Sequence, residues 1–169
     1  MQLDAPARSQ LSLIPSGAAG INETLRVMRA LTREGKKTLR IRERAGFLTK
    51  GCGQKDYACE VKKLHAFVRD QIRYLGDING VETVTSPEKT LDYGYGDCDD
   101  KSVLLAALLE SIGHPTRFVA IGFESGIFEH VYVETLIGTR WISLETTEPV
   151  EAGWQPDPKI VRARMEMYN

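Results

Sequence analysis

The sequence predicts a single α+β domain, because its helical patterns come first and its strand patterns follow. Residues 56–73 repeat apolar side chains at three- and four-residue steps, as in an amphipathic helix. Residues 103–109 are all apolar, and the Gly113 and Pro115 that follow them are typical of a helix end. Three strand-like segments come after Pro115, at 117–121, 128–136 and 140–144.

Length and composition are those of one soluble globular domain. A chain of 169 residues can build a proper core without a second domain. The net charge of −1 gives no bulk electrostatic reason to bind nucleic acid or an acidic membrane. No apolar run resembles a signal peptide or is long enough to span a bilayer. We therefore expect a cytoplasmic protein with no nucleic-acid or membrane partner.

The cysteines point to unpaired thiols. Cys52, Cys59 and Cys98 are an odd number with no close-set pair, which argues against a disulfide framework and against a zinc site. We expect a reducing compartment, no bound metal, and chemically inert thiols at Cys52 and Cys59.

Outside these patterns the chain is less informative. Residues 1–20 are punctuated by proline and glycine and look loose, and a helix is expected from Asn22 to about Arg33. The basic segment 36–50 could contact nucleic acid or an acidic partner, but a solvated surface is the favoured interpretation because glutamates are interleaved. A short helix should begin after Ser86. The tail, 151–169, is expected to be irregular, with at most a helical turn or two over 159–168.

Cys98 has the most suggestive position in the chain. It falls where a glycine-rich loop meets the apolar helix, close to unpaired backbone N–H groups and the positive end of the helix dipole. Both favour the thiolate, which is the nucleophilic form. The alternative is an ordinary buried thiol, but Asp97 and Asp99 beside it are unusual neighbours for a core cysteine.

A cysteine nucleophile needs a base and a group that orients the base. Among the histidines, His130 lies on the alternating strand, whereas His65 is expected to be a packing or surface residue and His114 part of a turn. A cross-strand packing role for His130 remains open. For an oxyanion site, the backbone N–H of Cys98 is the natural first donor. The second donor is left unranked among Tyr74, Tyr93 and Tyr95.

The turn after the His130 strand decides whether Glu145 can be the orienting group. A two-residue loop at 137–138, or a four-residue loop, places Glu145 directly opposite His130. A two-residue loop at 138–139 places Glu145 opposite Tyr132, diagonal to His130 on the same face. A three-residue loop places it on the opposite face, and Glu145 is then an ordinary exposed carboxylate.

Four blocks of sequence resemble the core of the transglutaminase-like superfamily. They are 96–102 with the helix that follows, 129–134, 141–147, and the lead-in at 72–74 and 86–91. Together they cover about residues 60–150, and the Leu-Glu-Thr-Thr-Glu-Pro form at 144–149 is most similar to small bacteriophage and prophage proteins. The resemblance implies a papain-like fold, with a helical N-terminal part packed on an antiparallel sheet. Residues 1–55 would be an extension and 151–169 a tail of the same domain.

The resemblance also implies an activity and a site. By position in the motifs, Cys98 is the nucleophile, His130 the base and Glu145 the orienting acid, where the family usually has aspartate. Nothing matches the calcium sites of animal transglutaminases, so neither metal nor cofactor is implied. The implied reaction is acyl transfer from an amide or peptide bond of a protein or peptide substrate through a thioester, with hydrolysis favoured over cross-linking. A non-catalytic peptide-binding module, or a phage structural component with phage proteins as partners, is the alternative.

Overall fold

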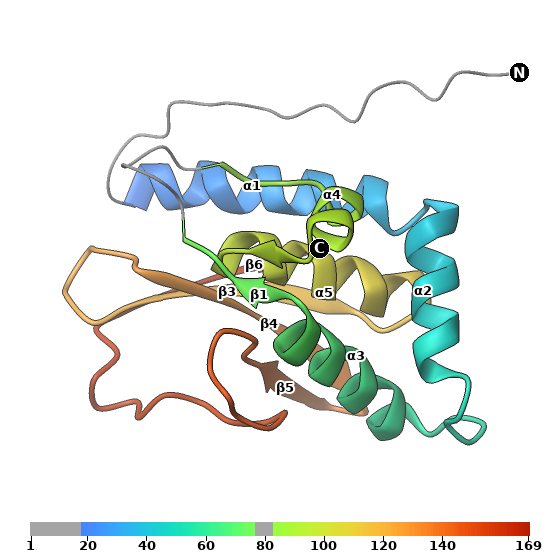
Figure 1. The fold of residues 1–169 in the computed structure, drawn as a ribbon. Helices are drawn as coiled ribbons and strands as arrows, with labels where there is room; N and C mark the ends of the chain where they lie inside the picture. The colour runs from blue at the N-terminus through green and yellow to red at the C-terminus, as the bar shows by residue number, and fades with distance from the viewer. Residues whose placement is uncertain (1–17, 77–82) are drawn as a thin grey trace, which may run out of the picture.

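The computed structural model describes residues 18–76 and 83–169, and its helices precede its main sheet (Figure 1). The elements in order are α1 (Ala18–Gly35), α2 (Leu39–Thr49), α3 (Tyr57–Gln71), β1 (Arg73–Tyr74), α4 (Pro87–Tyr93), β2 (Tyr95–Gly96), α5 (Cys98–Ser111), β3 (Thr116–Gly122), β4 (His130–Ile137), β5 (Arg140–Leu144) and β6 (Ala163–Tyr168). The predicted α+β class is confirmed. The first helix begins earlier than predicted, and the prediction for residues 1–17 lies outside the described part of the chain.

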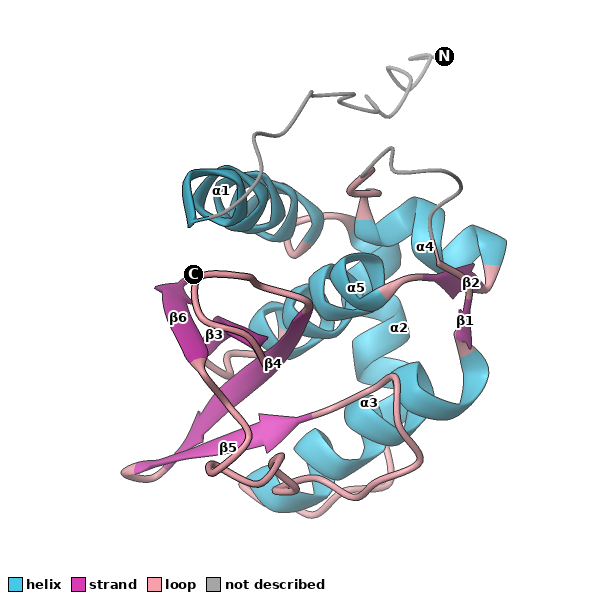
Figure 2. Ribbon diagram, turned by 90° about the vertical axis from the view of Figure 1, so that its left-hand side faces the viewer, coloured by secondary structure: helices cyan, strands magenta, loops and turns pink. Residues whose placement is uncertain are grey.

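Helix α5 is the centre of the fold. It lies between the four-stranded sheet and the other helices (Figure 2). Every side chain from Val103 to Leu109 is completely buried, against residues such as Met28 of α1 and Leu64 of α3. Such complete burial fixes the helix, and therefore the residue at its N-terminus, relative to the rest of the domain.

The sheet has the strand order β5-β4-β3-β6, and each neighbouring pair is antiparallel. The expectation of an irregular or helical end to the tail is wrong, because Ala163–Tyr168 forms β6 and pairs along β3. Met165 and Met167 pack on the core between charged neighbours that face outward. This period of two is a genuine strand signal, but in six residues it is easily mistaken for an irregular segment.

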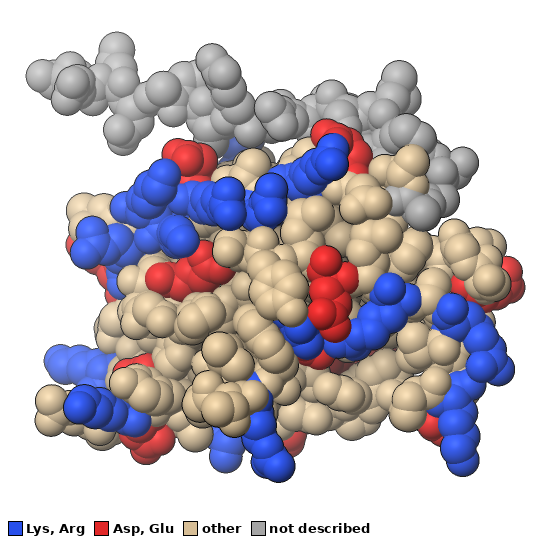
Figure 3. Space-filling model, turned by 180° about the vertical axis from the view of Figure 1, so that it is seen from behind, with Lys and Arg blue, Asp and Glu red and all other residues tan. Residues whose placement is uncertain are grey.

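Charges on the surface follow the near-neutral balance of the sequence. On the face drawn in Figure 3, basic side chains form a row across the upper part, with a few acidic side chains at its edges and much neutral surface below it. The rest of this face carries both signs of charge.

Cys52 and Cys59 form a disulfide bond, which contradicts the expectation of unpaired thiols. The chain turns sharply after α2, and Asp56 caps α3 by accepting a hydrogen bond from the backbone N–H of Cys59. This local turn brings the two Cα atoms to 5.7 Å, although the cysteines are seven residues apart in sequence. The expected reducing compartment rested on unpaired thiols and loses that support.

We predict that removing this disulfide lowers the free energy of unfolding by about 2.5 kcal/mol, because the open chain gains conformational freedom when unfolded. Urea unfolding of a Cys52→Ser/Cys59→Ser variant measures the change. The Cys98→Ala variant keeps the disulfide and is the matched control. Adding a reductant should lower its stability, as it should for the wild-type protein. Equal stability of the wild-type protein with and without reductant would contradict the prediction.

The outer face of the sheet is held by an ion-pair network around Arg117. Its guanidinium contacts Glu134 at 2.5 Å and Glu166 at 2.6 Å, and lies 4.5 Å from the centre of the Trp141 ring. Glu134 is almost completely buried, so its carboxylate depends on these partners.

Replacement of Arg117 by alanine should therefore cost about 2–3 kcal/mol of stability, since it leaves a buried carboxylate with fewer donors. Arg164 also contacts Glu134, at 3.1 Å, but is more exposed. The matched Arg164→Ala variant should cost less than about 1 kcal/mol. Denaturant titrations of the two variants test this order. Equal losses of unfolding free energy would show that the burial of the arginine does not determine the size of the loss.

Candidate active site

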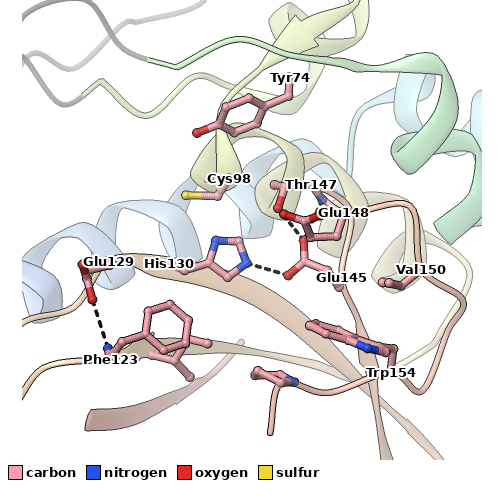
Figure 4. A pocket seen from close by; sticks show the side chains of 12 residues that line it. Tyr74, Cys98, Phe123, Glu129, His130, Glu145, Thr147, Glu148, Val150 and Trp154 are labelled. Atoms are coloured by element: carbon pink, nitrogen blue, oxygen red, sulfur yellow. Dashed lines mark hydrogen bonds and ion pairs between the residues drawn. The ribbon is translucent and has the colours of Figure 1, made fainter. Parts of the chain in front are cut away.

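The three predicted catalytic residues come from separate elements and meet at one cavity. Cys98 begins α5, His130 begins β4, and Glu145 directly follows β5. All three line a cavity of about 530 Å³ (Figure 4). The cavity forms where the N-terminus of the buried helix lies beside the end of the sheet.

The register of the β4–β5 hairpin brings Glu145 to His130. Ile137 pairs with Arg140, so the turn is the two-residue loop at 138–139, one of the predicted alternatives. Gly138 has φ of 61°, a conformation that glycine adopts without strain. The diagonal placement suffices for contact, because Nε2 of His130 lies 2.5 Å from Oε2 of Glu145.

Glu145 is held as a carboxylate in a buried place. Its second oxygen, Oε1, accepts hydrogen bonds from the backbone N–H of Thr147 at 2.6 Å and from its hydroxyl at 2.7 Å. Burial acts to raise the pKa of Glu145, but the hydrogen bond with His130 and those from Thr147 outweigh it and bring the pKa to about 2. Both oxygens are thus engaged, and the group can orient an imidazole and stabilise its cation.

Two residues support the site without having been predicted to do so. Thr147 was quoted only as part of a motif, and the sole signal for it was its position two residues after the acid. His65 is buried, as a packing residue would be, and its Nε2 also contacts the backbone carbonyl of Glu145. Burial lowers the pKa of His65, so the ring is neutral and Nε2–H donates to that carbonyl. Through this bond α3 holds the backbone of the acid.

Cys98 is half-buried and its sulfur faces the cavity. Figure 4 shows the sulfur beside the His130 ring, on the side away from Glu145, so that Nδ1 is the ring nitrogen available to it. Asp97 caps the helix by accepting a hydrogen bond from the backbone N–H of Asp100 at 3.0 Å. The prediction that Cys98 lies at a loop-to-helix junction is therefore confirmed.

The surroundings of Cys98 oppose the thiolate expected from the sequence. Burial raises the pKa of the Cys98 thiol, and the carboxylates of Asp99 and Asp97 raise it further. The thiol also lies 3.6 Å from Oδ1 of Asp99, a contact that favours keeping the proton. The helix start supplies N–H groups as predicted, but low solvent access and adjacent negative charge oppose their effect. The proton must then leave during the reaction.

Tyr74 is the tyrosine that the structure places at the site. Its side chain lines the cavity with Cys98, and Figure 4 shows its hydroxyl on the open side of the sulfur. Tyr93 and Tyr95 instead stack on each other, with ring centres 5.5 Å apart, and neither is among the residues lining this cavity. His114 pairs with Glu60 at 2.7 Å, away from the cavity, as expected of a turn residue.

Residues 46–146 match the family model of the transglutaminase-like superfamily, which is more than half of the chain. The chain belongs to this superfamily. The match begins at residue 46, before the region of about 60–150 in which the sequence showed the resemblance, and it covers most of that region. A comparison with curated proteins found no match.

Solved structures share the fold. The chain is similar to a "putative protease" from Parabacteroides distasonis (TM-score 0.58, 16% identity), over 73% of this chain and 26% of that one. It is similar to a "putative cysteine protease" from Cytophaga hutchinsonii (TM-score 0.52, 19% identity), over 77% of this chain and 46% of that one. It is also similar to Legionella pneumophila LapG (TM-score 0.50, 17% identity), over 81% and 76%. The chain thus spans less than half of the first two proteins.

Within residues 18–76 and 83–169, no group of three or more His, Cys, Asp or Glu side chains is arranged to hold a metal ion. In the same part of the chain, no helix is both long enough and apolar enough to cross a bilayer.

We predict that His65 acts as a positioning residue. Replacement by leucine should lower the rate of the chemical step by about 10²-fold, because the backbone of Glu145 loses its donor and the acid shifts. A His65→Gln variant, which keeps an N–H donor, should recover much of the rate. Single-turnover rates, with circular dichroism to confirm folding, measure the effect. Equal losses in both variants would indicate a purely packing role.

Proposed function

We propose that this protein is a cysteine-dependent hydrolase of amide or peptide bonds. The observation that carries the proposal is the convergence of Cys98, His130 and Glu145 on one open cavity, with Glu145 bonded to His130. Nucleophile, base and orienting group in this arrangement are what covalent acyl transfer requires. The names of the first two structural neighbours, both described as proteases, add support.

The proposed mechanism gives each proton a route. Nδ1 of His130 accepts the Cys98 proton as the sulfur attacks the carbonyl carbon, so a raised thiol pKa in the resting site is compatible with reaction. Glu145 stabilises the resulting imidazolium. The imidazolium then protonates the leaving amine, and a thioester remains on Cys98. Water, deprotonated by His130, attacks the thioester, which releases the acid and restores the thiol.

The negative oxygen that develops on the carbonyl needs donors. The backbone N–H of Cys98 at the start of α5 supplies one, and the Tyr74 hydroxyl supplies the second in this proposal. A Tyr74→Phe variant, which keeps the ring, should lose about 10²-fold or more in kcat with little change in KM. An unchanged kcat would remove Tyr74 from the oxyanion site.

Hydrolysis and cross-linking differ only in what attacks the thioester. We favour water, because microbial members of the superfamily are more often regarded as proteases than as cross-linking enzymes. The test is product analysis of a cleaved peptide with and without added primary amine. Free acid in both samples supports hydrolysis, and a dominant amide adduct would show transamidation.

The phage or prophage origin suggested by Leu144–Pro149 remains part of this proposal, with a peptide of the host or of the phage particle as the substrate. The disulfide bears on its location. A Cys52–Cys59 bond fits a particle or another oxidising setting better than the reducing cytoplasm that we expected from the sequence.

The first test of the proposed activity is mass spectrometry of peptide libraries incubated with the protein. Wild-type protein should cleave a subset of peptides, and Cys98→Ala, which removes only the nucleophile, should cleave none. A covalent thioester on Cys98 should be trapped by acid quenching. Cleavage that survives in Cys98→Ala would contradict the proposal.

The raised thiol pKa predicts a specific pH dependence. Because Cys98 is the free cysteine, iodoacetamide labels a single site. The thiolate fraction increases as pH rises toward the thiol pKa, so the labelling rate should still be climbing at pH values where an ordinary exposed thiol has levelled off. A plateau near neutral pH would show instead that a thiolate–imidazolium pair already exists at rest.

A further inference from the structure

Cys98 and His130 lie where two cavities meet. The larger one, of about 530 Å³, opens toward the segment that follows β5, and a smaller one, of about 170 Å³, opens toward α1. Both are lined by Cys98, Glu129 and His130. Space therefore continues on two sides of the sulfur. A site for a terminal amide would be closed on one side, whereas this one suits a chain that passes through.

Carboxylates mark both parts of this cleft. Glu129 is exposed and lines both cavities, and Glu148 is exposed and lines the larger one. Oε2 of Glu129 accepts a hydrogen bond from the backbone N–H of Phe123 at 3.0 Å, which orients the side chain without cancelling its charge. Among the described residues, no lysine or arginine lines either cavity or forms an ion pair with these two glutamates.

One part of the wall of the larger cavity is apolar. It is formed by Ile121, Phe123, Val150, Trp154 and Pro156. Phe123 and Trp154 are each 43% exposed, a large aromatic surface to leave in water beside a nucleophile. An apolar side chain of a substrate would cover these rings, and the carboxylates would face its polar neighbours.

We propose that the substrate is an extended polypeptide cleaved at an internal bond, with a lysine or arginine next to that bond facing Glu129 and Glu148, and an apolar side chain in the larger cavity. This inference rests on the proposed hydrolase function and names its substrate class. Glu129 and Glu148 are then specificity-determining residues. They bind the substrate cation and take no part in proton transfer.

Such a substrate would also help the reaction. Negative charge around the sulfur opposes ionisation of Cys98. A bound cation beside Glu129 offsets part of that charge and favours the thiolate when the substrate is in place. The resting protein would keep a less reactive thiol, and reactivity would rise with the correct substrate.

The test uses the full chain and a set of fluorogenic peptides built on a sequence selected from the library. Members differ only in having Lys, Gln or Glu at each position flanking the cleaved bond. We expect kcat/KM for the Lys peptide to exceed that for the Glu peptide by about tenfold at low salt, and the ratio to shrink as salt is added.

Variants assign the preference to the two glutamates. Glu129→Lys should reverse the Lys-over-Glu ratio, and Glu148→Gln should reduce it. Glu43→Lys makes the same charge change on the exposed side of α2 and should leave the ratio unaltered. Since the ratio compares two substrates of one variant, a partial loss of folding does not disturb it.

The outcomes separate this inference from the function on which it rests. Cleavage of internal bonds with a Lys preference that follows Glu129 supports the inference. Cysteine-dependent cleavage without a charge preference, or cleavage confined to chain ends, overturns it and leaves the hydrolase function standing. If no peptide is cleaved faster by wild-type protein than by Cys98→Ala, both the function and the inference fail.

Discussion

The register of a single β-hairpin determines whether His130 and Glu145 can meet in the proposed catalytic site. With the two-residue turn at 138–139, Glu145 lies on the same face as His130 and within bonding distance. A slip of one residue would turn the carboxylate to the other face of the sheet, toward the core around α5. A slip is opposed by β4, in which Val131 and Val133 pack in the core, and by Gly138 at the turn. The contact between these two side chains therefore depends on the backbone pairing of the hairpin.

Helix α5 is buried along its length, but its first residue must be accessible. Its apolar body is buried for packing, yet Cys98 at its N-terminus must face a cavity. The burial that fixes the sulfur also raises the pKa of its thiol, with help from Asp99 and Asp97. The burial that positions the sulfur precisely therefore also disfavours the thiolate in the resting protein. The structure fixes the position of the Cys98 sulfur, and in the proposed mechanism His130 removes the thiol proton during the reaction.

Much of this arrangement follows from the sequence, because it depends on strong periodic patterns. The apolar run of α5, the alternation of β4 and the motif around Cys98 predict the fold class and bring the three catalytic candidates together. The turn was ambiguous because residues 137–139 allow several loops, and only pairing along the whole hairpin selects one. The packing of the core therefore determines which of the registers allowed by the local sequence is formed.

The features that sequence did not reveal depend on contacts between distant or irregular segments. The Cys52–Cys59 bond results from a loop path that spacing alone does not give. The role of His65 depends on a contact across 80 residues of chain, with a backbone atom that has no sequence signature. The strand β6 carries a weak alternation that becomes meaningful only beside β3.

One buried lysine has a consequence for how the site can move. Lys101, in the first turn or so of α5, is 2% exposed, and its Nζ donates a hydrogen bond at 2.7 Å to the backbone carbonyl of Ile72. The same α5 begins with Cys98, and Tyr74 comes two residues after Ile72. The sulfur and the tyrosine ring therefore share one rigid frame. If the cleft opens for the proposed substrate, we expect the movement in the opposite wall, the irregular segment that carries Glu148 and Trp154.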